Sequence, residues 1–453
     1  MTRVTLGRPA PVQSIGVDPD RALRRVLAAI WQQHPAVIVP APPGSGKSFL
    51  IELVASMMGR PAEPVAIACQ TVAQTRDLAH RIADAYWPGI PQVTWLAASG
   101  TAPSSHPGVR VVTAAKDVGT DTSVVVATAA KWATVKPDLL DIRLLVVDEA
   151  WQLTDANFAR IAPLCQRYLL VGDPGQIAPV VTGDVREWRH LPYGPHRAAP
   201  EVLRWRFTGT PDRPLPDCLR WIPLDKTRRF GADSVSVLQP VFYPDLPFSS
   251  AAPEARLEVD MMGLPRYRNL YLRAAAGTQI IGGWLPPATP GLVDREMAAD
   301  AAALAEDLLQ CSSVVRDGQT IPLRPEDVAI VCARRAQVTA ILAHLNTPGI
   351  RVDTAERLQG QQAEVVIMYH PTSGLPEVSD FVRNAGRTCV MASRHRTACF
   401  VLVREGTREI LEAQGMASER ILSDEPDDNY KGWKANLDFL DALATDSRRA
   451  AIG

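Results

Sequence analysis

A loop rich in proline and glycine separates two apolar segments near the start of the chain. Residues 37–39 are Val-Ile-Val, residues 41–48 read Ala-Pro-Pro-Gly-Ser-Gly-Lys-Ser, and residues 49–54 are Phe-Leu-Ile-Glu-Leu-Val. This order of strand, loop and helix is that of a P-loop, whose backbone N–H groups and helix N-terminus point at phosphate. A plain glycine turn followed by a solvated lysine is the alternative. The spacing favours a nucleotide site made by Pro43, Gly44, Ser45, Gly46, Lys47 and Ser48.

Two of these residues have particular chemistry. In a P-loop the lysine, here Lys47, reaches the β- and γ-phosphates, and the hydroxyl of Ser48 is a ligand for Mg²⁺. Ala41 stands where the usual pattern has glycine, but the amides that cradle phosphate are unaffected. We therefore expect ATP and Mg²⁺ as ligands.

A second apolar run ends in a pair of carboxylates. Residues 144–147 are Leu-Leu-Val-Val, and Asp148 and Glu149 follow directly. In the Walker B arrangement the aspartate holds the Mg²⁺ of the nucleotide and the glutamate polarises the attacking water. Such a pair could also form a simple turn. Its place downstream of a P-loop, among alternating predicted strands and helices, favours a hydrolase.

Length and composition narrow the class of protein. The 453 residues suffice for two to three domains, and 46% hydrophobic with 21% charged residues is an ordinary globular balance. The net charge of −1 means that any nucleic acid must be held by a local groove. The seven cysteines show no Cys-x-x-Cys spacing, which argues against zinc and a disulfide framework. With no apolar span of transmembrane length, we expect a cytoplasmic protein without membrane contact.

Two threonines follow predicted strands in the first half of the chain. Thr71 comes just after residues 64–69, Thr128 ends residues 123–128, and a helix-forming segment follows each. A strand that ends in a small polar residue at a helix N-terminus suits a contact with backbone phosphate, although an ordinary strand–helix connection is equally consistent. Trp132 could stack on a base, but a core position is the more typical one.

The first-half motifs resemble those of a known family. Asp-Glu-Ala-x-Gln at residues 148–152, followed by Gly-Asp-x-x-Gln at residues 172–176, is similar to motifs II and III of superfamily 1 helicases, especially the Upf-like branch. The resemblance extends over residues 37–403, most of the chain. It implies an α/β fold of two tandem RecA-like P-loop domains with parallel sheets, plus small insertions.

The second half completes the resemblance. Residues 224–230, 352–367 and 389–396 resemble motifs IV, V and VI, and residues 327–337 resemble the start of the second RecA-like domain. Motifs I, II, III and VI are specific in this order, whereas IV and V are weak individually. Gln362 stands where the family usually has glutamate, which bears on nucleotide sugar preference or coupling.

The resemblance also implies roles for named residues. Arg394, expected after a run of strand-forming residues, would reach across the interdomain cleft to the γ-phosphate, and Arg229 would do so from the junction. Gln176 would sense the γ-phosphate. The remaining implied contacts are Gln359 and Gly360 with the nucleotide, and Thr71, Thr128 and Thr354 with the polymer.

These segments predict a domain plan. Residues 1–17 form a flexible arm, and residues 18–230 form the first RecA-like domain, with small insertions near 88–122 and 181–223. Residues 231–422 form the second RecA-like domain. Residues 423–453 comprise an acidic linker and a C-terminal helix that docks on the core or on a protein partner.

The sequence therefore predicts an ATP-hydrolysing enzyme, a nucleic-acid-dependent ATPase that translocates on and unwinds DNA or RNA. Single-stranded nucleic acid is the expected partner. The alternatives are an ATP-dependent nucleic-acid remodeller and a nucleotide-gated binding module, both without strand separation.

Overall fold

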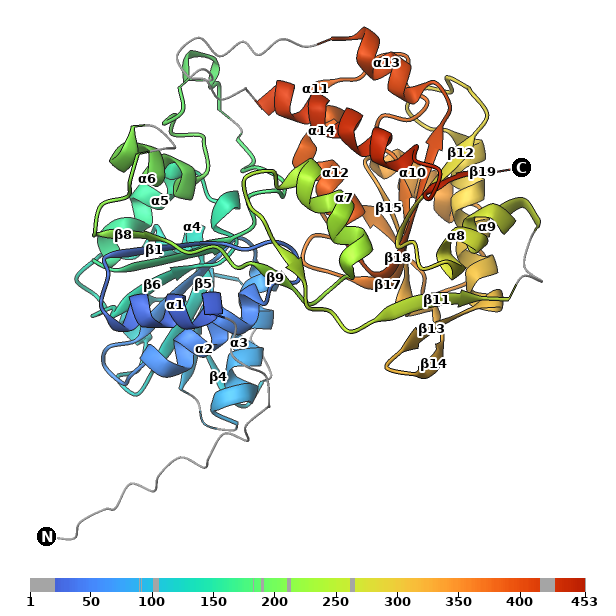
Figure 1. Ribbon diagram of the computed structural model, residues 1–453. Coiled ribbons are helices and arrows are strands. Elements are labelled where there is room, and N and C mark those ends of the chain that lie inside the picture. The colour runs from blue at the N-terminus through green and yellow to red at the C-terminus, as the bar shows by residue number, and fades with distance from the viewer. Residues whose placement is uncertain are drawn as a thin grey trace, which may run out of the picture.

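The computed structural model describes residues 21–88, 90, 92–100, 106–181, 183–188, 191–209, 213–260, 265–415 and 428–452. The predicted arm, residues 1–17, and residues 423–427 of the predicted linker lie outside these ranges. The described chain forms two α/β domains, each built on a parallel sheet and joined through the segment around β9 (Figure 1). The predicted fold class is confirmed.

The first domain is built on an eight-stranded parallel sheet. Its strands are apolar on both faces because helices cover both sides. In spatial order they are β4 (Val109–Val112), β3 (Val93–Leu96), β5 (Val124–Thr128), β2 (Val65–Cys69), β6 (Leu144–Val147), β7 (Tyr168–Gly172), β1 (Ala36–Pro40) and β8 (Leu219–Trp221). One face packs against α1 (Arg21–Trp31), α2 (Lys47–Met58) and α3 (Val72–Tyr86), and the other against α4 (Ala129–Trp132), α5 (Asp155–Ile161) and α6 (Ala199–Thr208).

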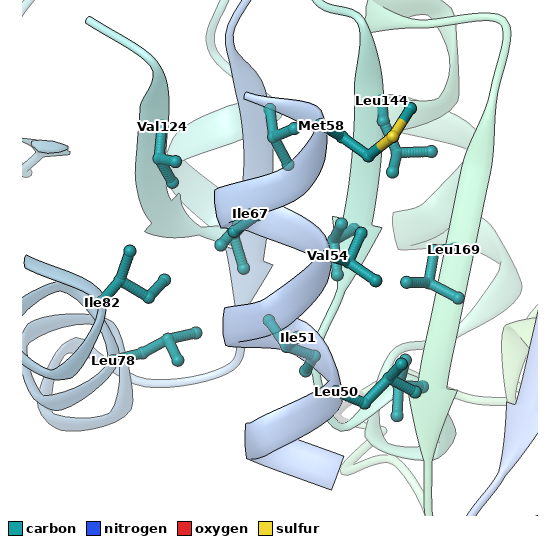
Figure 2. Close-up of a cluster of buried hydrophobic side chains, with 14 of the residues drawn as sticks. Leu50, Ile51, Val54, Met58, Ile67, Leu78, Ile82, Val124, Leu144 and Leu169 are labelled. Atoms are coloured by element: carbon teal, nitrogen blue, oxygen red, sulfur yellow. The ribbon is translucent and has the colours of Figure 1, made fainter. Parts of the chain in front are cut away.

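Helix α2, which leaves the P-loop, is anchored by one apolar face. Its buried residues pack on side chains from β2, β5, β6, β7 and the neighbouring helix α3, as Figure 2 shows for Leu50, Ile51, Val54 and Met58. Burying such side chains stabilises the fold by about 1.5–3 kcal/mol each. This packing fixes the position of Lys47, the first residue of the helix.

The second domain is built on a six-stranded parallel sheet. In spatial order its strands are β16 (Arg351–Thr354), β15 (Val328–Cys332), β17 (Ala363–Tyr369), β18 (His395–Arg404), β12 (Ile280–Leu285) and β19 (Arg449–Ala451). One face packs against α8 (Arg268–Ala275), α9 (Arg295–Cys311) and α10 (Arg335–Leu342). The other packs against α7 (Ala232–Phe242), α11 (Asp380–Arg383), α12 (Ala385–Ala392), α13 (Thr407–Ala413) and α14 (Asp428–Leu443).

Two smaller sheets complete the fold. An antiparallel sheet consists of β11 (Ala255–Val259), β13 (Ser312–Arg316) and β14 (Gln319–Pro322). At the junction, β9 (Lys226–Thr227) pairs with β10 (Ser249–Ser250).

The expected insertions correspond largely to elements of the first domain. Strands β3 and β4, within residues 88–122, and β8, within residues 181–223, extend the main sheet. Helix α6 packs on the core through Ala199 and Val202. The ring of Trp205 lies 4.6 Å from that of Tyr193, so these aromatics pack on each other. These strands are therefore part of the first domain's sheet, and the bounds of the expected insertions stay a prediction.

The C-terminal segment belongs to the second domain. The buried face of α14 contributes Phe439, Leu440 and Leu443 to the core, and β19 extends the sheet beside β12. The chain's own core thus occupies the apolar face that was a candidate for a protein partner. Trp132 is also fully buried, where its Nε1 donates to the carbonyl of Ile67. Among the described residues, no helix is both long and apolar enough to cross a membrane.

Candidate active site

The P-loop runs from β1 into α2 through two glycines in the left-handed region. Gly44 has φ +74° and Gly46 φ +90°, values that other L residues rarely adopt. The hydroxyl of Ser45 is buried and finds no hydrogen-bond partner among the described residues. A nucleotide phosphate would satisfy such a donor, as it would the loop amides.

The ammonium group of Lys47 lies between two carboxylates. Its Nζ is 3.8 Å from Oε1 of Glu149 and 3.7 Å from Oδ2 of Asp173. Strands β6, β7 and β1 are neighbours, so their carboxyl ends bring the lysine and both carboxylates to one edge of the sheet. At these distances the pairing is loose, and the phosphates of a bound nucleotide would compete for the lysine.

Asp148 and Glu149 follow β6 in different environments. Nε2 of Gln70 donates to the carbonyl of Asp148 at 3.0 Å, and Oδ1 of Asp148 accepts from the backbone N of Glu149 at 2.9 Å. Burial and the adjacent Glu149 raise the pKa of Asp148 well above the usual range of an aspartate. Glu149 has φ +50°, a strained value for glutamate that accompanies its position beside Lys47.

The segment that joins the domains closes over the P-loop. Oγ1 of Thr227 donates to the carbonyl of Pro43 at 2.7 Å, and the backbone N of Arg228 donates to the carbonyl of Gly44 at 2.9 Å. A Cβ on Gly44 would lie 2.4 Å from Cβ of Arg229, so this contact also requires glycine. Arg229 is therefore held beside the phosphate loop.

Two arginines, the half-buried Arg229 and the buried Arg394, lie together where the two domains meet. Nη1 of Arg229 donates to the carbonyl of Ser393 at 2.8 Å, while its Nε is buried and unpartnered in the described structure. Arg394 is 2% exposed and donates to the carbonyl of Val390 and to Oγ of Ser393, both at 3.0 Å. Burial and the nearby Arg394 lower the pKa of Arg229 to about 9.

The arginine partners in the described chain are neutral oxygens, and neither guanidinium forms an ion pair there. Two guanidinium groups this close together, one buried and one half-buried, make an environment that favours an anion. The local structure differs from the sequence expectation in one respect. Arg394 follows the C-terminal end of α12 and precedes β18, rather than following a strand.

The loop after β7, residues 173–177, links the two domains. Oδ2 of Asp173 accepts from Nε2 of Gln176 at 2.6 Å, and Oε1 of Gln176 accepts from Nε2 of Gln359 at 2.9 Å. Gln359 and Gly360, the predicted nucleotide contacts of the second domain, lie in the loop between β16 and β17, where Gly360 has φ +81°. A chain of contacts thus runs from Lys47 through Asp173 and Gln176 to the second domain.

Helix α12 meets the same loop at Gly386. A Cβ there would lie 2.3 Å from the carbonyl O of Gln176. Because alanine is favoured over glycine inside a helix, Gly386→Ala should leave the second domain folded while forcing the domains apart. We expect its maximal ATPase rate to fall by up to about 100-fold, the effect of displacing the loop by roughly an ångström. Steady-state ATPase assays measure it.

Gly432→Ala is a matched control for this variant. In α14, a Cβ at Gly432 would lie 2.4 Å from the carbonyl O of Arg383, a similar clash inside one domain. We expect Gly432→Ala to lower the melting temperature more than Gly386→Ala does, with a smaller loss of ATPase rate in the folded protein. The reverse order would contradict the interdomain role of Gly386.

The three predicted nucleic-acid contacts lie at or just after strand ends. Oγ1 of Thr71 accepts from the backbone N of Gln74 and caps α3, and Oγ1 of Thr128 accepts from the backbone N of Lys131 and caps α4. Thr128 pairs in register with Cys69, so both threonines lie at one edge of the first sheet. Thr354 ends β16 and is buried. Their contact with nucleic acid stays a prediction.

Several residues of the site were missed from the sequence. Gln70, Tyr243 and Gly386 have no distinguishing neighbours along the chain, and only the fold brings them to the site, where the ring of Tyr243 lies against Gly175. Asp173 was visible within Gly-Asp-Pro-Gly, a pattern typical of a turn. Its position directly after a buried strand, like that of Asp148, was the signal that could have identified it.

Two family models, each described as an AAA domain, match the chain over residues 21–191 and 294–405. The first span contains the P-loop, the Asp148–Glu149 pair and the loop after β7, and the second contains Gln359 and Arg394. The chain is a P-loop protein of the superfamily 1 helicase type.

This helicase-type chain is similar to proteins of known sequence and structure. An uncharacterized ATP-dependent helicase of Caenorhabditis elegans is 27% identical over 81 residues, which make up 18% of this chain and 5% of that protein. The chain therefore spans only a small part of that relative.

Solved structures include arterivirus nonstructural protein 10 (helicase) in complex with DNA, with 16% identity, TM-score 0.43, and coverage of 84% of this chain and 62% of that one. The PRRSV helicase has 14% identity and TM-score 0.42, with coverage of 84% and 54%.

Proposed function

We propose that this chain is a nucleic-acid-dependent ATPase that translocates on single-stranded DNA or RNA and unwinds duplexes. The observation that carries the proposal is the pair of arginines, the half-buried Arg229 and the buried Arg394, which have neutral partners. They lie together beside the P-loop, where Arg229 approaches Gly44. Such a pair suits the γ-phosphate of ATP.

The carboxylates of the first domain supply the chemistry. ATP in the P-loop would take Lys47 as a phosphate partner and relieve its contacts with Glu149 and Asp173. Glu149 is then free to accept a proton from the attacking water. Gln176, bonded to Asp173 and Gln359, carries the state of the site to the second domain.

The arginines couple hydrolysis to motion. Arg229 and Arg394 favour the closed cleft while a γ-phosphate is present, and hydrolysis with loss of that phosphate removes the attraction. Arginines that act in this way contribute about 10³–10⁵ to the rate of phosphoryl transfer. Repeated closing and opening would move the domains along the polymer.

The residues present fit a magnesium ion bound with the nucleotide. Ser48 and Asp148 are hard oxygen donors, and the described residues contain no cluster of three or more histidine, cysteine or acidic side chains that could hold a metal without the nucleotide. The ion would neutralise phosphate charge during transfer.

The polymer would lie across the strand ends that carry Thr71, Thr128 and Thr354. Contacts to phosphate position a strand without selecting its sequence. Resemblance to the Upf-like branch supports 5′-to-3′ movement, as an analogy. The seven free cysteines support a reducing, cytoplasmic location.

Strand displacement tests the proposal. The substrates are DNA and RNA duplexes with a single-stranded 5′ or 3′ tail, and the control is Lys47→Ala. We expect ATP-dependent displacement by the unsubstituted protein from a 5′-tailed duplex, and at least about 100-fold less by the variant. ATP hydrolysis stimulated by the polymer without displacement would support the remodelling alternative. Binding gated by nucleotide, with no turnover, would support the binding module.

A further inference from the structure

Each arginine of the pair is followed in the chain by a buried ring. Phe230 comes directly after Arg229, His395 comes directly after Arg394, and both ring residues are fully buried. The two rings stack on each other, with centroids 5.5 Å apart and an angle of 24° between their planes. Two segments that lie far apart in the sequence are thus joined at the residues that adjoin the arginines.

A hydrogen bond also holds the ring of His395. Its Nε2 lies 2.7 Å from Oγ of Ser234, a buried residue of α7. That hydroxyl donates to Oε1 of Gln279 at 2.9 Å, and the backbone N of Ser234 donates to the same oxygen at 3.3 Å. Gln279 directly precedes β12, so the imidazole is fixed to a helix and to the start of a strand of the second domain.

Phe230 belongs to the second domain, although the residues just before Arg229 bond to the P-loop. The ring of Phe230 lies in the core that α7 and β18 share, and its carbonyl accepts from Oγ of Ser250 at 3.0 Å. A Cβ on Gly231 would lie 2.7 Å from Nε2 of Gln279, so the chain also passes close to that side chain as it enters α7. Arg229 therefore lies where the contacts of the chain change from the first domain to the second.

The backbone of Arg394 is fixed to the same domain. Its carbonyl accepts from the backbone N of Ala363 on β17 at 3.0 Å, and His395 begins β18. The two arginine segments are also linked by the hydrogen bond from Nη1 of Arg229 to the carbonyl of Ser393. The stack of Phe230 on His395 is a second link between these segments, and it lies inside the core.

We propose that His395 is a positioning residue of the nucleotide site, which acts through its stack on Phe230 by holding Arg229 and Arg394 as one unit of the second domain. When the domains separate, both arginines leave the P-loop together. When the domains close, both return at a fixed spacing, so that a γ-phosphate meets two preorganised guanidinium groups. This inference rests on the proposed γ-phosphate role of the arginines, and not on turnover or translocation.

Two substitutions of His395 separate stacking from hydrogen bonding. His395→Leu removes both contacts, whereas His395→Phe keeps a ring for Phe230 and removes only the bond to the hydroxyl. His370→Leu is the matched control. His370 is another fully buried residue of the second domain, its ring stacks on Phe439 with centroids 6.1 Å apart, and its Nδ1 lies 3.0 Å from the hydroxyl of Thr372. The two leucine variants should therefore lower the melting temperature by similar amounts.

Nucleotide preference is measured without polymer, by titration of each full-length variant with Mg²⁺ and either ADP or AMP-PNP, a non-hydrolysable ATP analogue. We expect the unsubstituted protein to bind AMP-PNP at least about tenfold tighter than ADP, the effect of charge-assisted hydrogen bonds to the γ-phosphate. His395→Leu should lose most of this preference while its ADP affinity stays within about twofold. His395→Phe and His370→Leu should keep the preference.

Turnover uses the same variants. We expect His395→Leu to lower kcat for ATP by about 10–100-fold, because a misplacement of roughly an ångström has an effect of this size. His395→Phe should recover most of that rate, and His370→Leu should stay within about twofold of the unsubstituted protein. Phe230→Leu removes the stack from its other side and should lose the same preference, with no further loss when it is combined with His395→Leu.

An unchanged preference for AMP-PNP in His395→Leu, or an equal loss in His370→Leu, would overturn the inference. Loss of the preference in His395→Phe would overturn the stack as its cause, and no preference in the unsubstituted protein would overturn the role of both arginines. If His395→Leu does not fold, Phe230→Leu decides by the same criteria. The expected preferences in a protein that hydrolyses no ATP with any polymer would leave the inference standing and refute the proposed function instead.

Discussion

Glu149→Gln should lower the rate of ATP hydrolysis by about 10²–10⁴-fold, because an amide cannot accept the proton of the attacking water. The substitution keeps the size of the side chain and removes one of the two carboxylates beside Lys47. Nucleotide affinity should therefore hold or rise. Single-turnover hydrolysis and equilibrium binding of ATP, measured on the same preparation, separate the two effects.

Glu52→Gln provides the control for that variant. Glu52 lies on α2, close in sequence to Lys47, and pairs with Arg81 at 3.3 Å on the side of α3. Burial raises its pKa, so it is also a partly buried carboxylate, but it contacts no residue of the site. We expect its turnover to stay within about twofold of the unsubstituted protein, as for most substitutions away from a site. Equal losses of ATP turnover in Glu52→Gln and Glu149→Gln would show that Glu149 takes no part in the chemical step.

Arg394→Ala should lower kcat by about 10³-fold or more while the protein stays folded. Among the residues that the structure describes, the guanidinium donates to the carbonyl of Val390 and to the hydroxyl of Ser393. Its removal therefore leaves no described carboxylate without its partner. The affinity for ADP, which has no γ-phosphate, should change little. Steady-state kinetics and ADP binding measure the two quantities.

Two further variants are compared with Arg394→Ala. Arg394→Lys is the conservative substitution, and Arg396→Ala is the control. Lysine keeps the charge but not the planar fork, so it should recover only part of the lost rate. Arg396 lies two residues away on β18, is more exposed, and pairs with Glu364 at 3.5 Å. Its loss should leave turnover nearly unchanged. A rate for Arg394→Ala within tenfold of that for Arg396→Ala would exclude a role at the γ-phosphate.

The parts of the site that the sequence predicted are those set by local rules. A phosphate loop needs glycines with positive φ directly before a helix, and Gly44 and Gly46 have those values. A Walker B pair needs a buried strand just before it, and β6 ends at Val147. Each of these two motifs is complete within about ten residues, so it can be recognised in the sequence without knowledge of the fold.

Contacts between domains have no such local signal. Gly386 looks like an ordinary residue between Ala385 and Arg387, and only its approach to the carbonyl of Gln176 explains the glycine. Tyr243 was likewise indistinguishable from a core tyrosine, because it is one. Its second contact, with Gly175, where an added Cβ would lie 2.4 Å from the ring, depends on how α7 meets the loop after β7.

The place of three short strands in the first domain also has no local signal. Strands β3, β4 and β8 are short and their flanks are rich in glycine, proline and polar residues, which is also the composition of a surface insertion. What assigns them to the main sheet is pairing with distant strands, such as β8 with β1. Long-range pairing of this kind is not encoded in the composition of the strand itself.

The central claim is that polymer binding drives ATP hydrolysis at the cleft between the two domains. ATP turnover with and without single-stranded DNA and single-stranded RNA, in the unsubstituted protein and in Lys47→Ala, tests it most directly. We expect at least one polymer to raise kcat about tenfold or more, and Lys47→Ala to abolish the rise, because Lys47 is the cation that the triphosphate requires. Slow turnover that no polymer changes, or stimulation that survives Lys47→Ala, would contradict the claim.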